Sequence, residues 1–283
     1  MKRREFLKVI TTLIIGAGFA PEVLAEIATT PSSSPPKNHD DHIRDYIYKM
    51  RHFNEHHMDD VYLDPQNYKL LKSSAKRLQR LQRTVGYGNF YLLSFDNALK
   101  IARNYSRVGG FTKTELNFLE RIFYEDGSLY GFFGEKPIKN LTDRVKKQEV
   151  IKIPHTGNYL YKGQPYTIYN KIKKDIGDQV ILTSGVRSVI KQFMLFLNKA
   201  CESNGNLSMA SRSLAPPGYS FHGIGDFDVG QVGFGKANFT ERFTTTDVFR
   251  KLKKFGYVKM RYQQDNFLGV RFEPWHIKIN MKT

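Results

Sequence analysis

The sequence predicts an α+β protein, in which a mostly helical region is followed by a region that mixes short strands with helices. Residues 41–149 show apolar positions at helical spacing, and β-rich runs between turn residues begin near residue 150. The strands and helices do not follow a regular βαβ alternation. The chain has 283 residues, 40% of them hydrophobic, including 21 Phe and 16 Tyr. That composition supports a real core and excludes a disordered protein.

The first 25 residues form a predicted export signal. "MKRREFLK" is a basic start, "VITTLIIGAGFA" an apolar run and "VLA" a small-residue end. The apolar run is too short for a permanent membrane anchor. Arg3 and Arg4 resemble a twin-arginine signal, but Lys2 replaces the usual Ser or Thr, so a general secretory signal stays open. We expect a bacterial protein exported to the periplasm or cell envelope.

The mature chain divides into a linker and two further regions. Residues 26–40 are rich in Pro and Ser and predict a linker. In the helical region 41–149, Asp64 and Pro65 start a helix that ends near Gly86, and its apolar stripe contains Leu71, Leu78 and Leu81. Thr112 and Glu115 form a capping box for a second helix. Its apolar positions are Leu116, Leu119, Ile122 and Phe123.

Strands and helices mix in residues 150–283. "QVILTSGV" predicts a strand, "SVIKQFMLFLNKACE" a buried helix, and "TTDVFRKLKKFG" an amphipathic helix that stops at Gly256. "YVKMRY" and "VRFEPWHIKIN" predict closing strands. Cys201 is the single cysteine, so the chain cannot form an intramolecular disulfide, and we expect it to be half-buried late in its helix.

The net charge of +17 and the pI near 9.7 indicate an anionic partner. Nucleic acid and an anionic envelope polymer both fit the charge. A nucleic-acid binder would need a contiguous cationic groove and an affinity that falls steeply with salt. The lysines are instead spread along the chain, and no zinc-finger, homeodomain or RNA-recognition signature occurs. We therefore expect no nucleic-acid partner.

Two histidine-containing segments are candidate metal sites. "HDDHIRDYIYKMRHFNEHHMDD" holds His39, His42, His52, His56 and His57. Its "HFNEH" order differs from the HExxH of zinc peptidases, and the charged surroundings favour a solvated helix.

The second candidate set consists of His222, Glu273 and His276 with either Asp226 or Asp228. Two histidines and a carboxylate leave a zinc position open for water, and a further carboxylate can act as a general base.

Three motifs in this region resemble a known family. "SGVRSVIKQ", "SFHGIGDFDVG" and "EPWH" are similar to the SGYRSxxxQ, SxHxxGxAxD and ExWH motifs of VanY-like D-alanyl-D-alanine carboxypeptidases. These are zinc peptidases of the hedgehog/DD-peptidase fold that act on peptidoglycan stems. The resemblance implies a catalytic domain over 150–283, built on a mainly antiparallel sheet flanked by helices. It also implies one Zn²⁺ per chain.

The resemblance implies a role for each matched position. His222, Asp228 and His276 would bind zinc, and Asp226 would replace Asp228 if the alignment shifts. Glu273 would be the general base, and Arg187 would stabilise the oxyanion or bind the terminal carboxylate. The substrate site would be lined by Ser220, Gln192 and Trp275.

The sequence departs from the family motifs at two positions. The family aspartate stands seven residues after the histidine, where this chain has Val229, so Asp228 comes one residue early. Val186 replaces an aromatic residue before Arg187. A further constraint concerns "EPWH": three residues separate Glu273 and His276, so on a flat strand they would face opposite sides. We therefore expect the chain to bend at Pro274, which is tolerated at bulges.

The expected function is zinc-dependent D,D-carboxypeptidase activity on the terminal D-Ala-D-Ala bond of peptidoglycan stem peptides. A zinc-activated water, deprotonated by Glu273, would be the nucleophile. An L,D-carboxypeptidase or a murein endopeptidase would use the same chemistry. An inactive murein-binding module is a further alternative, supported by the irregular His–Asp spacing and opposed by the presence of Glu273.

Overall fold

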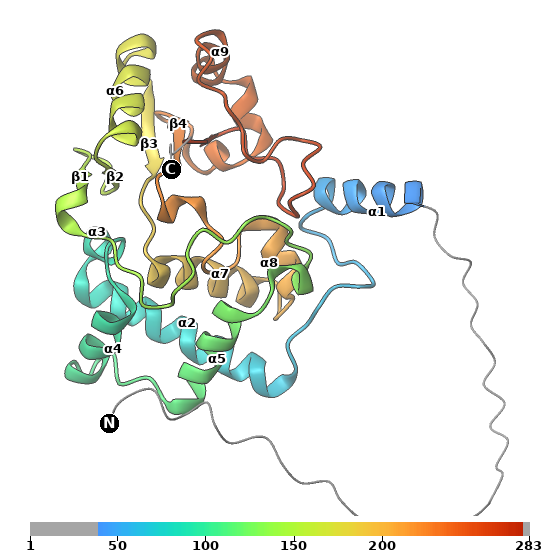
Figure 1. Cartoon of the computed structure of the whole chain (residues 1–283), viewed down its shortest axis with the longest axis vertical. Helices are drawn as coiled ribbons and strands as arrows, with labels where there is room; N and C mark the ends of the chain where they lie inside the picture. The colour runs from blue at the N-terminus through green and yellow to red at the C-terminus, as the bar shows by residue number, and fades with distance from the viewer. Residues whose placement is uncertain (1–38, 280–283) are drawn as a thin grey trace, which may run out of the picture. The chain divides into compact units, whose positions relative to one another are not determined.

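Residues 39–149 are mostly helical, and the strands begin at residue 150 (Figure 1). The computed structural model describes residues 39–279. The predicted export signal, and the linker as far as residue 38, lie outside the described residues. The α-helices are α1 His39–Arg51, α2 Pro65–Val85, α3 Tyr87–Phe90, α4 Phe95–Asn104, α5 Lys113–Tyr124, α6 Gln164–Ile176, α7 Val189–Glu202, α8 Leu207–Ser213 and α9 Asp247–Lys254. The strands are β1 Val150–Lys152, β2 Tyr159–Tyr161, β3 Val180–Ser184, β4 Phe227–Gln231 and β5 His276–Ile277.

The caps predicted for the two long N-terminal helices are confirmed. The Asp64 side chain accepts a hydrogen bond from the backbone N–H of Asn67, and Gly86 ends α2 with a φ of 86°. Thr112 and Glu115 form the reciprocal capping box of α5. These local bonds satisfy backbone donors at the first turns, which explains why the sequence alone located both helices.

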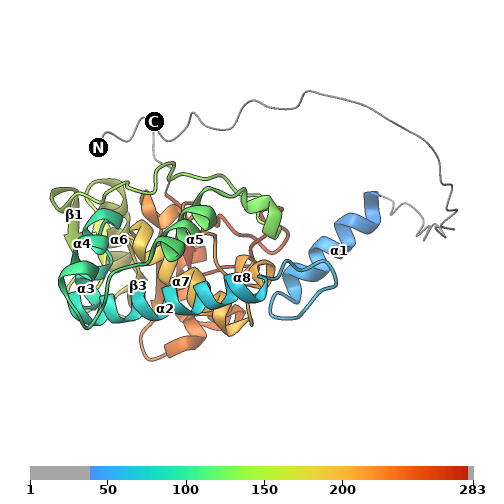
Figure 2. The same ribbon diagram turned by 90° about the horizontal axis from the view of Figure 1, so that it is seen from below.

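The helical region packs directly on α7. Helix α2 contacts both α7 and α5, and the three helices lie side by side in both views (Figures 1 and 2). The apolar stripe of α2 enters the same hydrophobic cluster as the buried face of α7. This cluster includes Leu71, Leu78, Leu81, Leu119, Ile122, Phe123, Ile190, Phe193, Phe196 and Leu197. The N-terminal helices therefore support the helix that follows the predicted "SGVRS" turn.

A small antiparallel sheet in the order β3-β4-β5 carries the second core. Phe227 and Val229 of β4 and Ile277 of β5 are buried in a cluster shared with α6 and α9. Helix α6 contacts β3 and helix α9 contacts β4 (Figure 1). Strands β1 and β2 form a separate antiparallel pair. The α+β prediction and the antiparallel sheet are confirmed.

Several predicted elements are wrong or shorter than expected. The segment 257–262, "YVKMRY", forms no strand, and "VRFEPWHIKIN" contributes only the two residues of β5. Helix α1 ends at Arg51, so His52 and His56 lie beyond it and share no helical face. Helices α6 and α8 were not predicted. The apolar alternation of the 257–262 segment could not show that the segment lacks a strand partner, because strand pairing depends on the tertiary structure.

Cys201 lies in the last turn of α7 and is partly buried, as predicted. Burial raises the pKa of its thiol, which fits a structural residue. Within residues 39–279, no helix is both long enough and apolar enough to span a membrane.

The segment after α1 is tied to the C-terminal half of the chain. Arg212 of α8 forms a bidentate ion pair with Asp60 at 2.6 and 3.0 Å, and their side chains are 4% and 1% exposed. From α1 itself, Tyr46 donates a hydrogen bond to the carbonyl of Asn266 and accepts one from the N–H of Gly269. Residues 46–60 therefore hold the loop that precedes Glu273.

We expect Asp60→Asn to lower the free energy of unfolding by about 3 kcal/mol, because it leaves the buried Arg212 charge without its partner. Burial opposes ionisation of Asp60, but the bonds from Arg212 and Asn206 outweigh it and lower its pKa. The pair therefore contributes stability above the usual aspartate pKa and loses it as the pH falls towards the lowered value. Urea unfolding at pH 7 measures the difference.

The matched control is Asp59→Asn. Asp59 pairs with Lys49, but its side chain is 70% exposed, so its loss should cost less than about 1 kcal/mol. Equal destabilisation by the two variants would contradict an anchoring role for the Asp60–Arg212 pair.

Candidate metal centre and active site

Asp228 occupies the middle of the sheet, with the other candidate residues around it. It lies on the central strand β4, where its Cα is paired with Ser184 of β3 and His276 of β5. The β3–β4 register shifts between Leu182 and Ser184, an irregularity of the kind that often re-aims side chains beside active sites. Because neighbouring Phe227 points into the core, Asp228 faces the opposite side of the strand.

His222 reaches Asp228 from the short 3₁₀ turn η3 Phe221–Gly223. Its Nδ1 lies 2.8 Å from the carbonyl oxygen of Gly185, and its Nε2 lies 3.2 Å from Asp228 Oδ1. A carbonyl can only accept, so Nδ1 carries the hydrogen and Nε2 keeps a lone pair for a metal. Burial and the nearby Arg187 charge lower the pKa of His222, which favours this neutral form.

His276 is held between the two candidate aspartates. Its Nδ1 lies 3.1 Å from Asp228 Oδ1, and its Nε2 lies 2.9 Å from Asp226 Oδ2. Asp226 also accepts bonds from Arg261 Nε at 2.7 Å and from the N–H of Ile279 at 2.8 Å. Burial opposes protonation of His276, but the hydrogen bonds that it donates to both aspartates outweigh burial and raise its pKa to about 10. A metal bound at Nδ1 would displace the proton there.

The three residues His222, Asp228 and His276 can present one ligand atom each within 4.8 Å of one another, and all three are buried. Among the side chains described for residues 43–279, no other group of three or more His, Cys, Asp or Glu residues meets that condition. The structure therefore does not bring Asp226 into this group, nor the histidines at 52, 56 and 57. Two imidazole nitrogens and one carboxylate oxygen suit Zn²⁺, and the other ring nitrogens have the partners expected behind a metal site.

Glu273 lies beside this cluster, at the bend predicted for "EPWH". The backbone N–H of His276 donates to the carbonyl of Glu273 at 3.2 Å, so the chain turns at Pro274 and the predicted bend is confirmed. Glu273 Oε2 then lies 3.6 Å from His276 Nδ1. Burial raises the pKa of Glu273 to about 7, where a carboxylate can exchange protons at neutral pH.

Arg187 contacts the cluster from the β3–α7 turn. Its Nη2 donates to Asp228 Oδ2 at 2.7 Å, and its Nε donates to Ser184 Oγ at 2.9 Å. Burial opposes ionisation of Asp228, but its interactions with His222 and then Arg187 outweigh burial and lower its pKa well below the usual range. Asp228 is therefore fully ionised.

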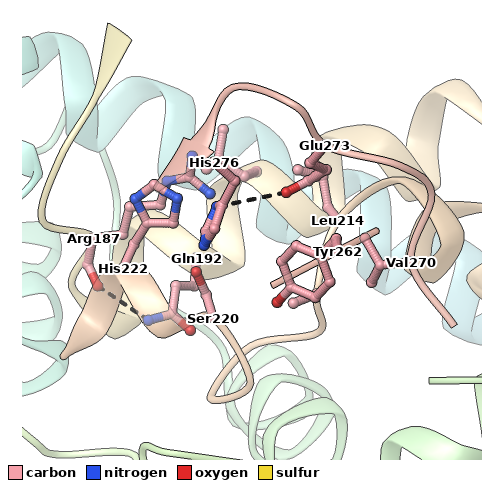
Figure 3. Close-up of a pocket in the computed structure, with 11 residues that line it drawn as sticks. Arg187, Gln192, Leu214, Ser220, His222, Tyr262, Val270, Glu273 and His276 are labelled. Atoms are coloured by element: carbon pink, nitrogen blue, oxygen red, sulfur yellow. Dashed lines mark hydrogen bonds and ion pairs between the residues drawn. The ribbon is translucent and has the colours of Figure 1, made fainter. Parts of the chain in front are cut away.

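A cavity opens beside the cluster, with polar groups from several segments converging on it (Figure 3). Its lining includes Arg187, Gln192, Ser220, His222, Tyr262, Glu273 and His276. Gln192 uses both ends of its amide internally, since it donates to the carbonyl of Arg187 and accepts from the N–H of Gly218. Trp275 does not line this cavity; it is 3% exposed and borders a neighbouring one.

Two residues at the site were missed by sequence reasoning. Tyr262 is 4% exposed, lines the cavity and packs edge-on against the His276 ring at 5.2 Å. Arg261 holds Asp226. Both belong to the segment wrongly predicted as a strand, and neither stands in a motif. The spacing of Asp226 and Asp228 was a usable signal, because alternate residues of an extended chain share one face.

The fold and the site define an α+β protein with a buried His–Asp–His cluster and a carboxylate on one cavity wall. Residues 167–280 match the family model VanY, D-alanyl-D-alanine carboxypeptidase. The match contains "SGVRS", "SFHGIGDFDVG" and "EPWH". Over residues 167–280 the chain is therefore similar to the VanY-like carboxypeptidase family, and the resemblance inferred from the motifs is confirmed.

Solved structures give weaker matches. A mutant of the vancomycin resistance D,D-pentapeptidase VanY, from a VanB-type resistance cassette and in complex with Zn(II), is 21% identical, covering 52% of this chain and 86% of that one, with a TM-score of 0.39. VanYB in complex with D-Alanine-D-Alanine is 21% identical, covering 52% of this chain and 83% of that one, with a TM-score of 0.39. The LdcB LD-carboxypeptidase is 22% identical, covering 42% of this chain and 58% of that one, with a TM-score of 0.34. No protein of curated function matches the chain. The family assignment therefore rests on the family model.

We expect Gly185→Ala to disrupt the site and lower stability. An added Cβ would lie 2.0 Å from the carbonyl oxygen of Tyr159, which is backbone and cannot rotate away. Overpacking of this kind costs roughly 1–3 kcal/mol or more. The carbonyl of Gly185 would also move away from His222 Nδ1. Chemical denaturation measures the loss of stability.

Gly110→Ala is the matched control, since its added Cβ would meet only the Arg103 side chain at an ordinary 3.5 Å. A Gly185→Ala protein as stable as this control would show that β3 can shift without cost.

Proposed function

We propose that the protein is a zinc-dependent D,D-carboxypeptidase that hydrolyses the terminal D-Ala-D-Ala bond of peptidoglycan stem peptides. One observation carries the proposal: a buried His222–Asp228–His276 cluster shares a cavity wall with Glu273 inside a VanY-like domain. A pure binding module would have no use for a buried carboxylate with a pKa near neutrality.

In this proposal His222 Nε2, His276 Nδ1 and a carboxylate oxygen of Asp228 hold the zinc ion. Zinc bound there supplies a Lewis acid, which makes water nucleophilic near neutral pH and polarises a carbonyl. Asp226 fixes the ring of His276 from the far side, through Nε2. Asp228 is therefore the proposed ligand and Asp226 the residue behind it, although Asp228 comes one residue earlier than in the family motif.

Glu273 is the proposed general base. It takes a proton from the attacking water at a carboxylate oxygen and returns that proton to the nitrogen of the departing D-alanine. Arg187, which borders the same cavity, stabilises the negative charge that develops on the carbonyl oxygen. The 2.7 Å hydrogen bond from Arg187 Nη2 to Asp228 Oδ2 holds the guanidinium in position.

Ser220 and Gln192 contribute to the substrate site in different ways. The Ser220 side chain lines the cavity and is available to a polar group of the peptide. Gln192 is committed to Arg187 and Gly218, so we assign it a positioning role. The net charge of +17 suits an exported protein that works on a polymer rich in carboxylates.

The zinc ligands are tested by elemental analysis of the purified protein. We expect near one zinc per chain in the wild type, and loss of zinc in His222→Ala and in Asp228→Ala. Asp226→Asn should retain zinc with an affinity lower by roughly 10- to 100-fold, because it acts on the metal only through His276. Full zinc in Asp228→Ala, combined with its loss in Asp226→Asn, would reverse the roles of the two aspartates.

Glu273→Gln tests the catalytic assignment. We expect kcat/KM for D-alanine release from a pentapeptide ending in D-Ala-D-Ala to fall by about 10²- to 10⁴-fold, with zinc content unchanged, because the amide cannot accept the proton. Glu202→Gln, an exposed change at the end of α7, is the control and should leave the rate unchanged.

Peptides ending in a single D-alanine after an L-centre, and intact cross-linked murein, distinguish the related activities. Release of D-alanine only from the tetrapeptide would replace the D,D-assignment by an L,D-carboxypeptidase, and cleavage only within cross-links by an endopeptidase. A zinc-loaded protein inactive on every substrate would overturn the enzymatic proposal.

A further inference from the structure

A second cavity, of about 270 Å³, adjoins the catalytic one and shares Arg187 and Glu273 with it. The helical region contributes Tyr91, the start of α7 contributes Lys191, and the segment before β5 contributes Arg271 and Trp275. Asp228 and Phe239 also border it. The cluster thus lies between two hollows, of which the proposed mechanism uses only the first.

Lys191 is an unusual residue in this position. It is 8% exposed, and among the side chains described for residues 43–279 no carboxylate lies within 4.0 Å of its ammonium and no hydrogen-bond acceptor contacts it. Its one close partner is the ring of Tyr91, whose centroid is 4.7 Å from Nζ. Its ammonium reaches the cavity, where the aromatic face of Tyr91 compensates only part of its charge and leaves it able to bind an anion.

Two further features oppose a cation here. Lys191 lies in the first turn of α7, where the helix dipole favours negative charge, and Arg187 lies one turn before it. Burial and then Arg187 lower the pKa of Lys191 to about 8, so at neutral pH the side chain is still mostly charged. A structural role would be filled better by an apolar residue.

Arg271 adds a second cation on the same cavity. Its guanidinium lies between the rings of Phe53 and Trp275, at 4.6 and 4.9 Å, and its buried Nε has no hydrogen-bond partner in the described part of the chain. The carboxylates that border the cavity, Asp228 and Glu273, belong to the metal cluster and its base. The cavity therefore has positive charge without a counter-ion of its own.

The sizes of the two hollows indicate which one has room for the longer part of a substrate. The cavity lined by Ser220 and Gln192 has room for little more than one water molecule, about 20 Å³, whereas the Lys191 cavity has about 270 Å³. A carboxypeptidase releases one residue and retains the longer acyl chain. The larger cavity therefore fits the acyl chain.

We propose that the cavity lined by Lys191 and Arg271 binds a carboxylate on the acyl side of the scissile bond. This inference rests on the proposed function and specifies its substrate: a stem peptide whose third residue is a diamino acid with a free second carboxylate, such as meso-diaminopimelate. The carboxylate supplies the counter-ion that Lys191 lacks, as a charge-assisted hydrogen bond in a site with little water.

Two peptides test the inference. Both end in D-Ala-D-Ala and differ only in the second carboxylate of the third residue, which is free in one and amidated in the other. Trp275 borders the cavity and is the single tryptophan of the sequence, so its fluorescence reports binding directly. Titrations use the zinc-loaded Glu273→Gln protein to prevent turnover, and kcat/KM is measured with the wild type.

We expect the free acid to bind at least 10-fold more tightly than the amide. In the Lys191→Met background this preference should fall below twofold, with the Kd of the amide peptide within twofold of its original value. The matched control is Lys199→Met, on the same helix, whose ammonium contacts Asn54; it should keep the full preference. Thermal melting checks that Lys191→Met and Lys199→Met fold like the wild type.

The outcomes separate this inference from the proposed function. Equal binding and equal kcat/KM for both peptides would overturn the inference while leaving the carboxypeptidase intact. Preferential binding of the acid without D-alanine release would support the inference and count against the catalytic proposal. The comparison in the unaltered Lys191 protein remains decisive even if Lys191→Met fails to fold.

Discussion

The buried charge of Asp228 is the constraint on which the rest of the site depends. A carboxylate removed from water is stable only when charges and donors surround it, and Asp228 has Arg187, His222 and His276 within 3.2 Å. These partners come from three separate parts of the chain. The β3–α7 turn, the 3₁₀ turn before β4 and the turn at Pro274 must all form for one side chain to be satisfied. The geometry of the cluster therefore follows from a requirement of folding.

The sequence predicted the features that depend on neighbouring residues better than those that depend on contacts between distant segments. Caps and apolar stripes located α2 and α5, and the odd spacing of Glu273 and His276 required the observed bend at Pro274. The strand predicted over 257–262 was wrong because its alternation had no neighbouring strand to pair with. The spacing of Asp226 and Asp228 left both open as ligands, and only the ring of His276 between them shows that they contact different nitrogens.

The helical region before residue 150 does more than cover a core. Its apolar stripes indicated packing against an unknown surface, and that surface is α7, which begins with the first turn after "SGVRS". Tyr91 from this region also borders the Lys191 cavity. The wall of the proposed acyl-side site therefore includes a part of the chain outside the family match at 167–280. Related domains with a different N-terminal region would present a different wall there.

The bonds from Tyr46 to Asn266 and Gly269 join residues more than 200 positions apart. Contacts of such sequence separation form late, since the entropy of closing a long loop must be met first. During synthesis the helices can pack on α7 while the final segment is still in the ribosome. Glu273 and His276 arrive only with that segment, so the cluster around Asp228 is completed only at the end of synthesis. Under the proposed function, a partly made chain would therefore carry no peptidase activity.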